Sequence, residues 1–392
     1  MSTAVSAPPA AATRVPSIML VAGEASGDLH GATLCRALRT LAPGCRLFGM
    51  GGTRMAAAGV ELLADVTSAA VVGGTEALGR LPRLYAAHRR LRQALAGPQR
   101  PGVLVLIDFP EFNLHLARWA RRARVPVVYF IPPQLWAWRR GRVKTMRRLV
   151  SLVLAVFPFE TRLYEEAGVA VQFVGHPVLD TLTDVPDRAR ARSALGVAAH
   201  EVMVGLLPGS RREEIRRMLP AMHAAAAAIA RARGHTRFVL GRAPTVDLEE
   251  VRRHAGTSPE IEIVDGRTHE VMRAADLLLV TSGTATLEAA LLGTPMVVIY
   301  RVSRLTELVV RRLVRIPWIS LANITLGRAV VPELIGVAAT GERLAAEALN
   351  LLGDPGALRA QRAAFGELTG ALGERGVGER AARLVLAAVA PA

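Results

Sequence analysis

The sequence contains little cysteine, a single lysine and no long hydrophobic run. Cys35 and Cys45 are its only cysteines. They form no C-x-x-C pair and no Cys/His cluster at metal-ligand spacing, so we expect no disulfide framework, no metal site and a reduced, cytosolic setting. The apolar stretch 149–159 is far shorter than the roughly 20 residues of a membrane span. Any membrane contact is therefore expected to be peripheral.

Acidic residues are outnumbered by basic ones, with 33 Asp and Glu against 49 Lys and Arg and a formal net charge of +16. An anionic partner fits that charge, whether nucleic acid, a phosphate-bearing substrate or an anionic membrane surface. A second interpretation stays open. Lys144 is the only lysine and alanine is abundant, and a GC-rich genome produces such a composition without any function.

The 392 residues are enough for two to three domains with sizeable cores. Residues 1–16 form a Pro/Ala-rich stub that we expect to be disordered, without the basic start and apolar core of a signal peptide. Beyond it, short runs of Val, Ile and Leu alternate with amphipathic helical stretches, as in parallel sheets covered on both faces. The expected strands are 17–22, 46–49, 103–107, 126–130, 150–156, 171–174, 202–207, 236–240, 261–264, 277–280 and 296–299.

A segment at 175–200, rich in Pro, Asp and Thr, divides these strands into two series. We therefore expect an α/β protein with two tandem Rossmann-like, doubly wound domains. Helical stretches at 340–352 and 355–390 close the chain, and a terminal helix is expected to cross back to the first domain. Open sheets of this kind bind ligands beyond the carboxyl ends of their strands, so the loops after the strands are the candidate sites.

Two such loops belong to the first series. The loop at 23–31, GEASGDLHG, brings the carboxylates Glu24 and Asp28 to the start of a helix, and the alternative is a plain turn with a capped helix. The loop at 108–113, DFPEFN, follows a buried strand, where partial desolvation would raise the basicity of Asp108. Asp108 is the candidate general base, with a helix cap or an arginine salt bridge as its alternative roles.

Two loops of the second series predict a nucleotide-diphosphate site. Each opens a helix with exposed backbone N–H groups, and an arginine adds guanidinium donors for a phosphate. Glu288, one helical turn beyond Thr284, is suited to accept hydrogen bonds from ribose hydroxyls. The G-x-G-x-x-G and Walker motifs of dehydrogenases and ATPases are absent. The residues expected in this site are Gly209, Ser210, Arg211, Ser282, Gly283, Thr284 and Glu288.

Two further segments predict contact with lipid. In 132–150, Trp136 and Trp138 precede a basic cluster, which fits an anionic lipid interface or, alternatively, a solvated basic helix with buried tryptophans. The basic amphipathic stretch 301–318 has the same two interpretations. The candidates for insertion into the membrane surface, unless their segment is an ordinary core helix, are Val71, Val72, Leu78, Leu81 and Leu84.

Seven motifs appear in the order GEASGD, GMGGTRM, DFPEFN, PPQLWAW, VGHP, LPGSR and SGTATLE. Together they resemble the lipid-A-disaccharide synthases of glycosyltransferase family 19, over about residues 17 to 350. The resemblance implies an inverting, metal-independent GT-B glycosyltransferase without a cofactor, with two Rossmann-like domains facing a cleft. Such an enzyme transfers 2,3-diacylglucosamine from UDP to the 6-hydroxyl of 2,3-diacylglucosamine 1-phosphate (lipid X). The products are UDP and the β-1,6 disaccharide of lipid A, the lipid anchor of Gram-negative lipopolysaccharide.

The same resemblance implies a role for each domain of the chain. Residues 17–178 would form the acceptor and membrane-facing domain, 179–352 the UDP-sugar-binding domain, and 353–392 the closing helices. Asn323 would join the donor site, and His176 of VGHP would pack at the hinge. The implied partners are the two acylated sugars and the anionic inner face of the cytoplasmic membrane, without nucleic acid. A homodimer is left open.

The sequence departs from the family pattern at Ala322, Pro132 and Gly336, where the family usually has Pro, Ser and a nearby Gln. Two other functions use the same scaffold. A UDP-sugar 2-epimerase would need neither the WAW segment nor an apolar surface for acyl chains. A non-catalytic lipid-binding relative is the other alternative, and retention of Asp108, Arg211 and Glu288 argues against it.

Overall fold

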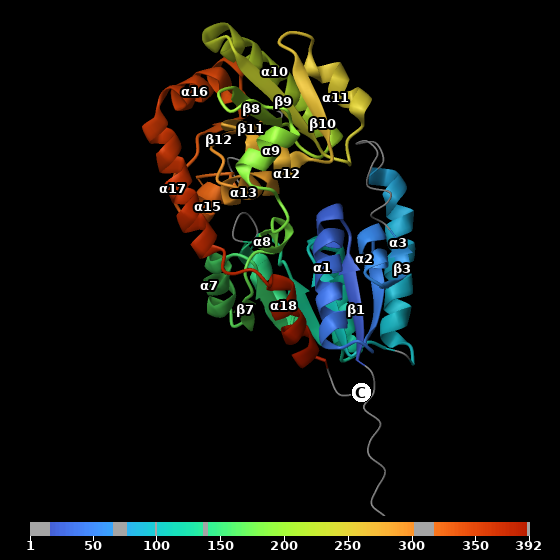
Figure 1. Cartoon of the computed structure of the whole chain (residues 1–392). Coiled ribbons are helices and arrows are strands. Elements are labelled where there is room, and N and C mark those ends of the chain that lie inside the picture. Colours follow the sequence, from blue (N-terminus) through green and yellow to red (C-terminus); the bar gives the residue numbers. More distant parts are fainter. Residues whose placement is uncertain (1–15, 66–76, 99, 136–139, 302–316, 390–392) are drawn as a thin grey trace, which may run out of the picture.

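The computed structural model describes residues 16–65, 77–98, 100–135, 140–301 and 317–389. Within these ranges the chain forms two parallel sheets, each flanked by helices (Figure 1). The α/β class expected from the sequence is thereby confirmed. In the same ranges no helix has both the length and the apolar character that crossing a bilayer requires.

The first sheet has the strand order β3-β2-β1-β4-β5-β6-β7, and its neighbouring strands run parallel. Its strands are β1 (Ser17–Ala22), β2 (Arg46–Gly51), β3 (Glu61–Asp65), β4 (Val103–Ile107), β5 (Val127–Phe130), β6 (Leu152–Ala155) and β7 (Val171–Phe173). The helices around it are α1 (Ala25–Leu41), α2 (Thr53–Ala57), α3 (Ala77–Ala96), α4 (Pro110–Arg122), η3 (Arg140–Arg142), α6 (Val143–Leu149) and α7 (Pro158–Glu166).

The second sheet has the order β10-β9-β8-β11-β12-β13, again parallel. Its strands are β8 (Val202–Leu207), β9 (Thr236–Arg242), β10 (Ile261–Asp265), β11 (Leu277–Thr281), β12 (Met296–Tyr300) and β13 (Glu333–Ile335). Its helices are α10 (Arg212–Arg233), α11 (Leu248–Ala255), α12 (Thr268–Ala274), α13 (Thr284–Leu291), α15 (Leu321–Leu326), η4 (Gly336–Ala338) and α16 (Gly341–Gly353), with α8 (Val178–Thr181) and α9 (Arg188–Ala194) leading into it.

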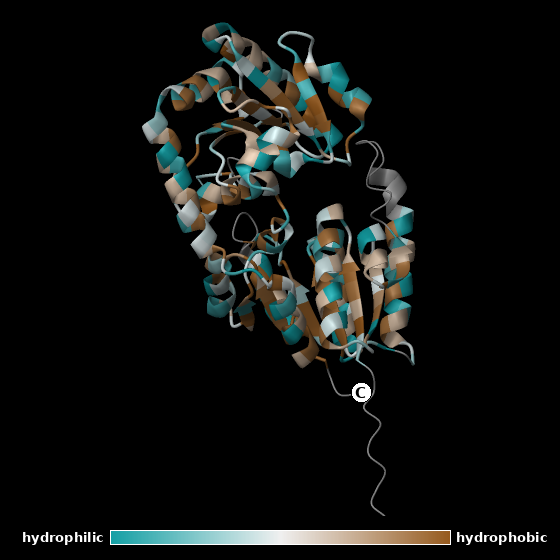
Figure 2. Ribbon diagram, viewed as in Figure 1, coloured by the Kyte–Doolittle hydropathy of each residue, from teal (hydrophilic) through white to brown (hydrophobic). Residues whose placement is uncertain are grey.

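Alternation along the strands places apolar side chains on both faces of each sheet. In β1, Leu20 packs in the same cluster as Leu34 of α1, whereas Val21 packs with Leu91 of α3 on the other face. Figure 2 shows the strands as hydrophobic bands between helices whose outer faces are more hydrophilic. This two-sided burial explains why the central strands appear in the sequence as uninterrupted runs of Val, Ile and Leu.

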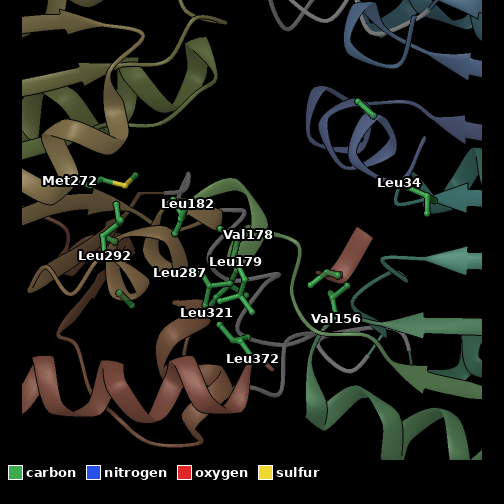
Figure 3. Packing of buried hydrophobic residues seen from close by; sticks show 14 of the residues in the cluster. Leu34, Val156, Val178, Leu179, Leu182, Met272, Leu287, Leu292, Leu321 and Leu372 are labelled. Carbon is green, nitrogen blue, oxygen red and sulfur yellow. The ribbon is translucent and has the colours of Figure 1, made fainter. Parts of the chain in front are cut away.

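One hydrophobic cluster continues from the first sheet into the second. At the junction Leu179 of α8 and Leu287 of α13 lie together with Leu321 of α15 (Figure 3). The chain then runs through α17 (Pro355–Ala371) to α18 (Val377–Ala387), which packs on α1 of the first half. Asp180 fixes the start of α18, because its carboxylate accepts hydrogen bonds from the N–H groups of Gly376 at 2.7 Å and Gly378 at 3.1 Å.

In both sheets the strand order reverses beside the first strand, and ligands of doubly wound sheets bind at such switch points. In the first sheet the loops 23–24 and 108–109 follow β1 and β4, the two strands at that point. In the second sheet the loops 208–211 and 282–283 follow β8 and β11 in the same way. The domain boundaries at 178/179 and 352/353 stay predictions.

Candidate active site

A cavity of about 320 Å³ lies where the first sheet's switch point faces the second half of the chain. Thr284 of α13 and Leu321 of α15 close it from the second half. Its walls in the first half come from the start of α1 and from the segments after β4, β5, β6 and β7, including the first residues of α4 and α7 and the end of η3: Ser26, Gly27, His30, Asp108, Pro110, Glu111, Ile131, Pro132, Pro133, Gln134, Leu135, Arg142, Val156, Phe157, Glu160 and His176.

Asp108 lies at the carboxyl end of β4 and lines this cavity. Burial raises the pKa of its carboxyl group from 3.8 to about 6, and the negative charge of Glu24 adds to the rise. A hydrogen bond from the Phe109 backbone and the positive charge of Arg211 act in the opposite direction and are weaker. A carboxylate with this pKa is ionised at neutral pH and is a stronger base than an exposed aspartate.

The backbone around Asp108 is strained and held by its neighbours. Asp108 and Phe109 have φ angles of 48° and 46°, in the left-handed region that residues other than glycine rarely adopt. The Asp108 carbonyl accepts hydrogen bonds from Asn113 Nδ2 at 2.6 Å and from the Tyr129 hydroxyl at 2.7 Å. Gly23 is needed on the other side, because a Cβ there would lie 2.2 Å from the Phe109 ring. Strain of this kind, fixed by buried partners, is typical of functional sites.

Glu24 and Asp28, the other carboxylates of the first loop, occupy different environments. Glu24 is the N-cap of α1, with an Oε2 atom 3.7 Å from a terminal nitrogen of Arg211. Asp28 is 4% exposed and accepts hydrogen bonds from the backbone N–H groups of Gly52, Arg54 and Met55 at 2.7–3.1 Å. It therefore caps α2 and not its own helix, and its carboxylate is committed to that structural contact.

The loop after β8 differs from the expected phosphate cradle. The N–H groups of Ser210 and Arg211 donate to Glu214 Oε2 at 2.9 and 3.2 Å, so they are already hydrogen-bonded within the protein and are not free to bind a phosphate. Gly209 has a φ of 117°, and a Cβ there would lie 2.3 Å from the same carboxylate. The Arg211 side chain is 70% exposed and reaches across to the first half. In this loop the guanidinium of Arg211, more than the backbone, is available to an anion.

The loop after β11 keeps an open helix start. Gly283 is the N-cap of α13 and forms no side-chain cap, and Thr284 lines the cavity. The Ser282 hydroxyl donates to the carbonyl of Ile319 at 2.8 Å, so it holds the segment before α15. Glu288 follows one turn into α13, with Oε1 3.6 Å from Nε2 of His269. The helix directs its partial positive charge toward the cavity.

Asn323, which the resemblance implies in the donor site, is fully buried. Its amide nitrogen donates to the carbonyl of Val331 at 2.9 Å and to Glu333 at 2.8 Å. Its amide oxygen accepts from the N–H groups of Val330 and Val331. Because both ends of the amide are engaged, Asn323 shapes the segment between α15 and β13 and has no free group for a ligand.

Most of the residues expected at a membrane lie outside the part of the chain that the structure describes. Val71, Val72, Trp136 and Trp138 lie outside the described residues, as does most of the stretch 301–318. Leu78 and Leu81 belong to α3, but their side chains lie outside the description as well. Leu84 is half-buried on α3, whereas Ala87, Leu91 and Leu95 of the same helix are buried against the sheet.

The cavity also contains polar residues that the sequence did not single out. His30 lies in the predicted first loop, and Arg142 in the basic segment after Trp138. Arg142 forms a two-point salt bridge with Glu111, with N···O distances of 2.7 and 2.9 Å. The sequence predicted the loops of His30 and Arg142. Which side chains of those loops face the cavity depends on the path of the folded backbone. Among the described residues no group of three or more His, Cys, Asp or Glu is placed to hold a metal ion.

Comparison with known sequences identifies relatives along almost the whole chain. A family model described as lipid-A-disaccharide synthetase matches residues 18–381. The lipid-A-disaccharide synthase of Myxococcus xanthus is 45% identical over 97% of this chain and 99% of its own length. That of Syntrophus aciditrophicus is 43% identical over 94% of this chain and 97% of its own.

Solved structures with the same architecture have low sequence identity and bear on the fold alone. The calicheamicin glycosyltransferase CalG4 matches 97% of this chain and 100% of its own with a TM-score of 0.60 at 16% identity. A UDP-GlcNAc 2-epimerase from Neisseria meningitidis matches 95% and 98% with a TM-score of 0.59 at 10% identity. Both likenesses agree with the expected GT-B arrangement of two Rossmann-like sheets.

Proposed function

We propose that this chain, which belongs to the lipid-A-disaccharide synthase family, uses Asp108 as the general base of its reaction. Its activity is that family's glycosyltransfer in lipid A biosynthesis. In the proposed reaction the 6-hydroxyl of 2,3-diacylglucosamine 1-phosphate attacks the anomeric carbon of UDP-2,3-diacylglucosamine. The new β-1,6 bond forms on the face opposite the bond to UDP, which breaks. The hydroxyl proton passes to Asp108, and UDP leaves with the bonding electrons.

The environment of Asp108 carries this proposal. A base for a sugar hydroxyl must be unprotonated at neutral pH, yet basic enough to accept a proton as the bond forms. Burial and Glu24 raise the pKa of Asp108 to about 6, which satisfies both requirements. Asn113 and Tyr129 bind the backbone carbonyl oxygen of Asp108 and not its carboxylate, and Asp108 lines the cavity.

The leaving diphosphate gains negative charge as the bond breaks, and two features of the second half suit it. Arg211 carries an exposed guanidinium beside Glu24. The start of α13, at Gly283 and Thr284, offers N–H groups and the positive end of the helix dipole. Glu288, one turn further along α13, is the proposed acceptor for the ribose hydroxyls.

We place the first half, with α3, against the anionic inner face of the cytoplasmic membrane, from which acylated substrates must be drawn. The net charge of +16 supports this placement, since a basic surface is attracted to anionic lipid. The half-buried Leu84 and the exposed Tyr85 of α3 supply apolar surface in the described part of that helix.

The reaction is tested by incubating the purified chain with both acylated sugars and separating the products. We expect a disaccharide and UDP in equal amounts, formed only when both substrates are present. A UDP-sugar epimerase would instead change the donor without the acceptor and release no disaccharide. Loss of the donor without formation of the disaccharide would overturn the proposal.

A further inference from the structure

His30 is a cavity residue to which the proposed reaction gives no role. It lies on α1, four residues after Ser26, and both residues line the cavity because positions four apart share a helix face. Its Nδ1 atom is shielded from solvent and has no hydrogen-bond partner among the described residues. Nε2 also has no partner there, but it is not shielded. The imidazole therefore has one unused polar atom that a ligand in the cavity can reach.

The surroundings of His30 fix its charge and its tautomer. Burial lowers its pKa from 6.5 to about 4, against a smaller upward effect of Glu288, so the ring is neutral at pH 7. A buried N–H group without an acceptor is rarer and more costly than an unpaired lone pair. The proton of the neutral ring therefore belongs on Nε2, which makes that atom a hydrogen-bond donor toward the cavity.

The location of His30 in the cavity indicates which part of the donor substrate it would contact. The cavity has Asp108, the proposed base, in one wall and Thr284, at the proposed diphosphate site, in another. In the reaction, the atoms between the base and the diphosphate are those of the transferred sugar. Glu288 of α13, in the second half, is close enough to raise the pKa of His30, and His30 lines the cavity together with Thr284 at the start of the same helix.

We propose that His30 donates a hydrogen bond from Nε2 to an oxygen of the transferred hexosamine and thereby positions the sugar of the donor. The inference rests on the proposed function and adds a residue for sugar recognition to it. A neutral donor suits a hydroxyl or carbonyl oxygen, whereas the anionic diphosphate is better served by Arg211 and the start of α13. His30 thus distinguishes the complete donor from UDP alone.

The test compares three substitutions, with kcat/KM for the UDP-sugar donor as the main readout. His30→Ala is expected to lower kcat/KM about 10-fold, the order expected for one lost hydrogen bond, with unchanged calorimetric affinity for UDP. His30→Gln is expected to restore most of the activity because its amide nitrogen can take the place of Nε2. His30→Asn, whose amide reaches only the level of Nδ1, is expected to resemble His30→Ala.

His223→Ala is the matched control. His223 also has a buried ring nitrogen without a partner among the described residues, but it lies on α10 and does not line the cavity. Its kcat/KM is expected to stay within twofold of the wild type. Thermal unfolding of each variant shows whether it is folded, and the Gln and Asn variants keep a polar side chain if His30→Ala does not fold.

Two results would overturn the inference. One is a kcat/KM for His30→Ala or His30→Asn within twofold of the wild type, and the other is a loss of UDP affinity as large as the loss of kcat/KM. Wild-type protein that forms no disaccharide would defeat the proposed function itself. An active wild type with an unaffected His30→Ala variant would defeat only the role of His30.

Discussion

The Arg211 guanidinium of the second half lies 3.7 Å from the Glu24 carboxylate of the first half, beside Asp108. Glu24 raises the pKa of Asp108 and Arg211 lowers it, so the two halves act on the candidate base with opposite signs. Arg211 is 70% exposed, so the ion pair itself is screened and adds little stability. In the proposed reaction, the pair places a cation for the leaving diphosphate next to the proposed base.

Asp108→Asn is expected to abolish turnover while the chain stays folded and binds UDP normally. The substitution removes the base without changing the volume of the side chain, and general-base catalysis contributes about 10²-fold or more. Steady-state rates and calorimetric titration with UDP measure the two properties separately. Near-normal turnover would transfer the role of the base to Glu24.

The pH profile of kcat/KM is expected to have an acid limb near pH 6, the pKa of Asp108. The carboxylate form is the base, so the rate stays at its plateau above pH 6 and falls about tenfold per pH unit below it. Glu24→Gln removes the negative charge that raises this pKa, and the limb is expected to move to lower pH. Glu213→Gln, on the exposed side of α10, is the control and should leave the limb in place. A limb that Glu24→Gln leaves unmoved would contradict the assignment.

The central strands were predictable from the sequence, whereas two edge strands were not. β1, β4 and β11 are buried on both faces, and such strands appear as uninterrupted apolar runs. β3 has the sequence ELLAD and no fully buried residue, and β13 has only the residues ELI. In β3 the acidic residues at both ends are exposed, whereas in β13 Glu333 accepts hydrogen bonds from the N–H groups of Ile319 and Ser320. In both strands the acidic residues and the short length remove the apolar signal.

The loops of the site were predictable because they follow strands that meet at a switch point, but the roles of single residues were not. The sequence shows only that Asp28 and Asn323 are polar. It does not show that Asp28 caps α2 or that Asn323 is enclosed between α15 and β13. The use of the Ser210 N–H by Glu214 is equally invisible in the motif LPGSR. These contacts depend on the orientation of side chains after packing, which local sequence patterns do not determine.

Glu288→Ala is expected to weaken UDP binding about 10- to 100-fold. It removes the proposed acceptor for the ribose hydroxyls, and a charge-assisted hydrogen bond contributes about 1.5–3 kcal/mol. Calorimetric titration with UDP measures the change. Glu249→Ala on α11, an exposed glutamate at the start of another helix, is the control and should bind UDP like the wild type. An unchanged dissociation constant for Glu288→Ala would mean that the nucleotide binds elsewhere.

Asp28→Ala is expected to destabilise the fold while kcat stays near the wild-type value at a temperature where the protein is folded. Three backbone N–H groups lose their acceptor, and a lost cap of this kind costs about 2 kcal/mol of unfolding free energy. Urea denaturation gives the free energy. Asp187→Ala, which removes the exposed cap of α9 with its single N–H partner, should cost less. Loss of kcat by folded Asp28→Ala protein would instead restore the catalytic role predicted from the sequence.

Binding of the chain to anionic vesicles is expected to weaken as salt rises. Each basic residue near an anionic surface contributes about 1 kcal/mol, and at physiological ionic strength charges are screened within about 8 Å. Replacing Leu81 and Leu84 of α3 by Ser is expected to reduce co-sedimentation with the vesicles without unfolding the protein, because Ala87, Leu91 and Leu95 keep the helix on the sheet.

Val337→Ser is the matched control for those two replacements. Val337 is 64% exposed, but it lies on η4 of the second half, far along the chain from α3, and its replacement should leave vesicle binding unchanged. An effect as large as that of the α3 variants would show that apolar surface anywhere on the chain drives adhesion. Absence of co-sedimentation even at low salt would attribute the basic excess to genome composition, and the acylated acceptor would then have to reach Asp108 by a route other than the membrane surface.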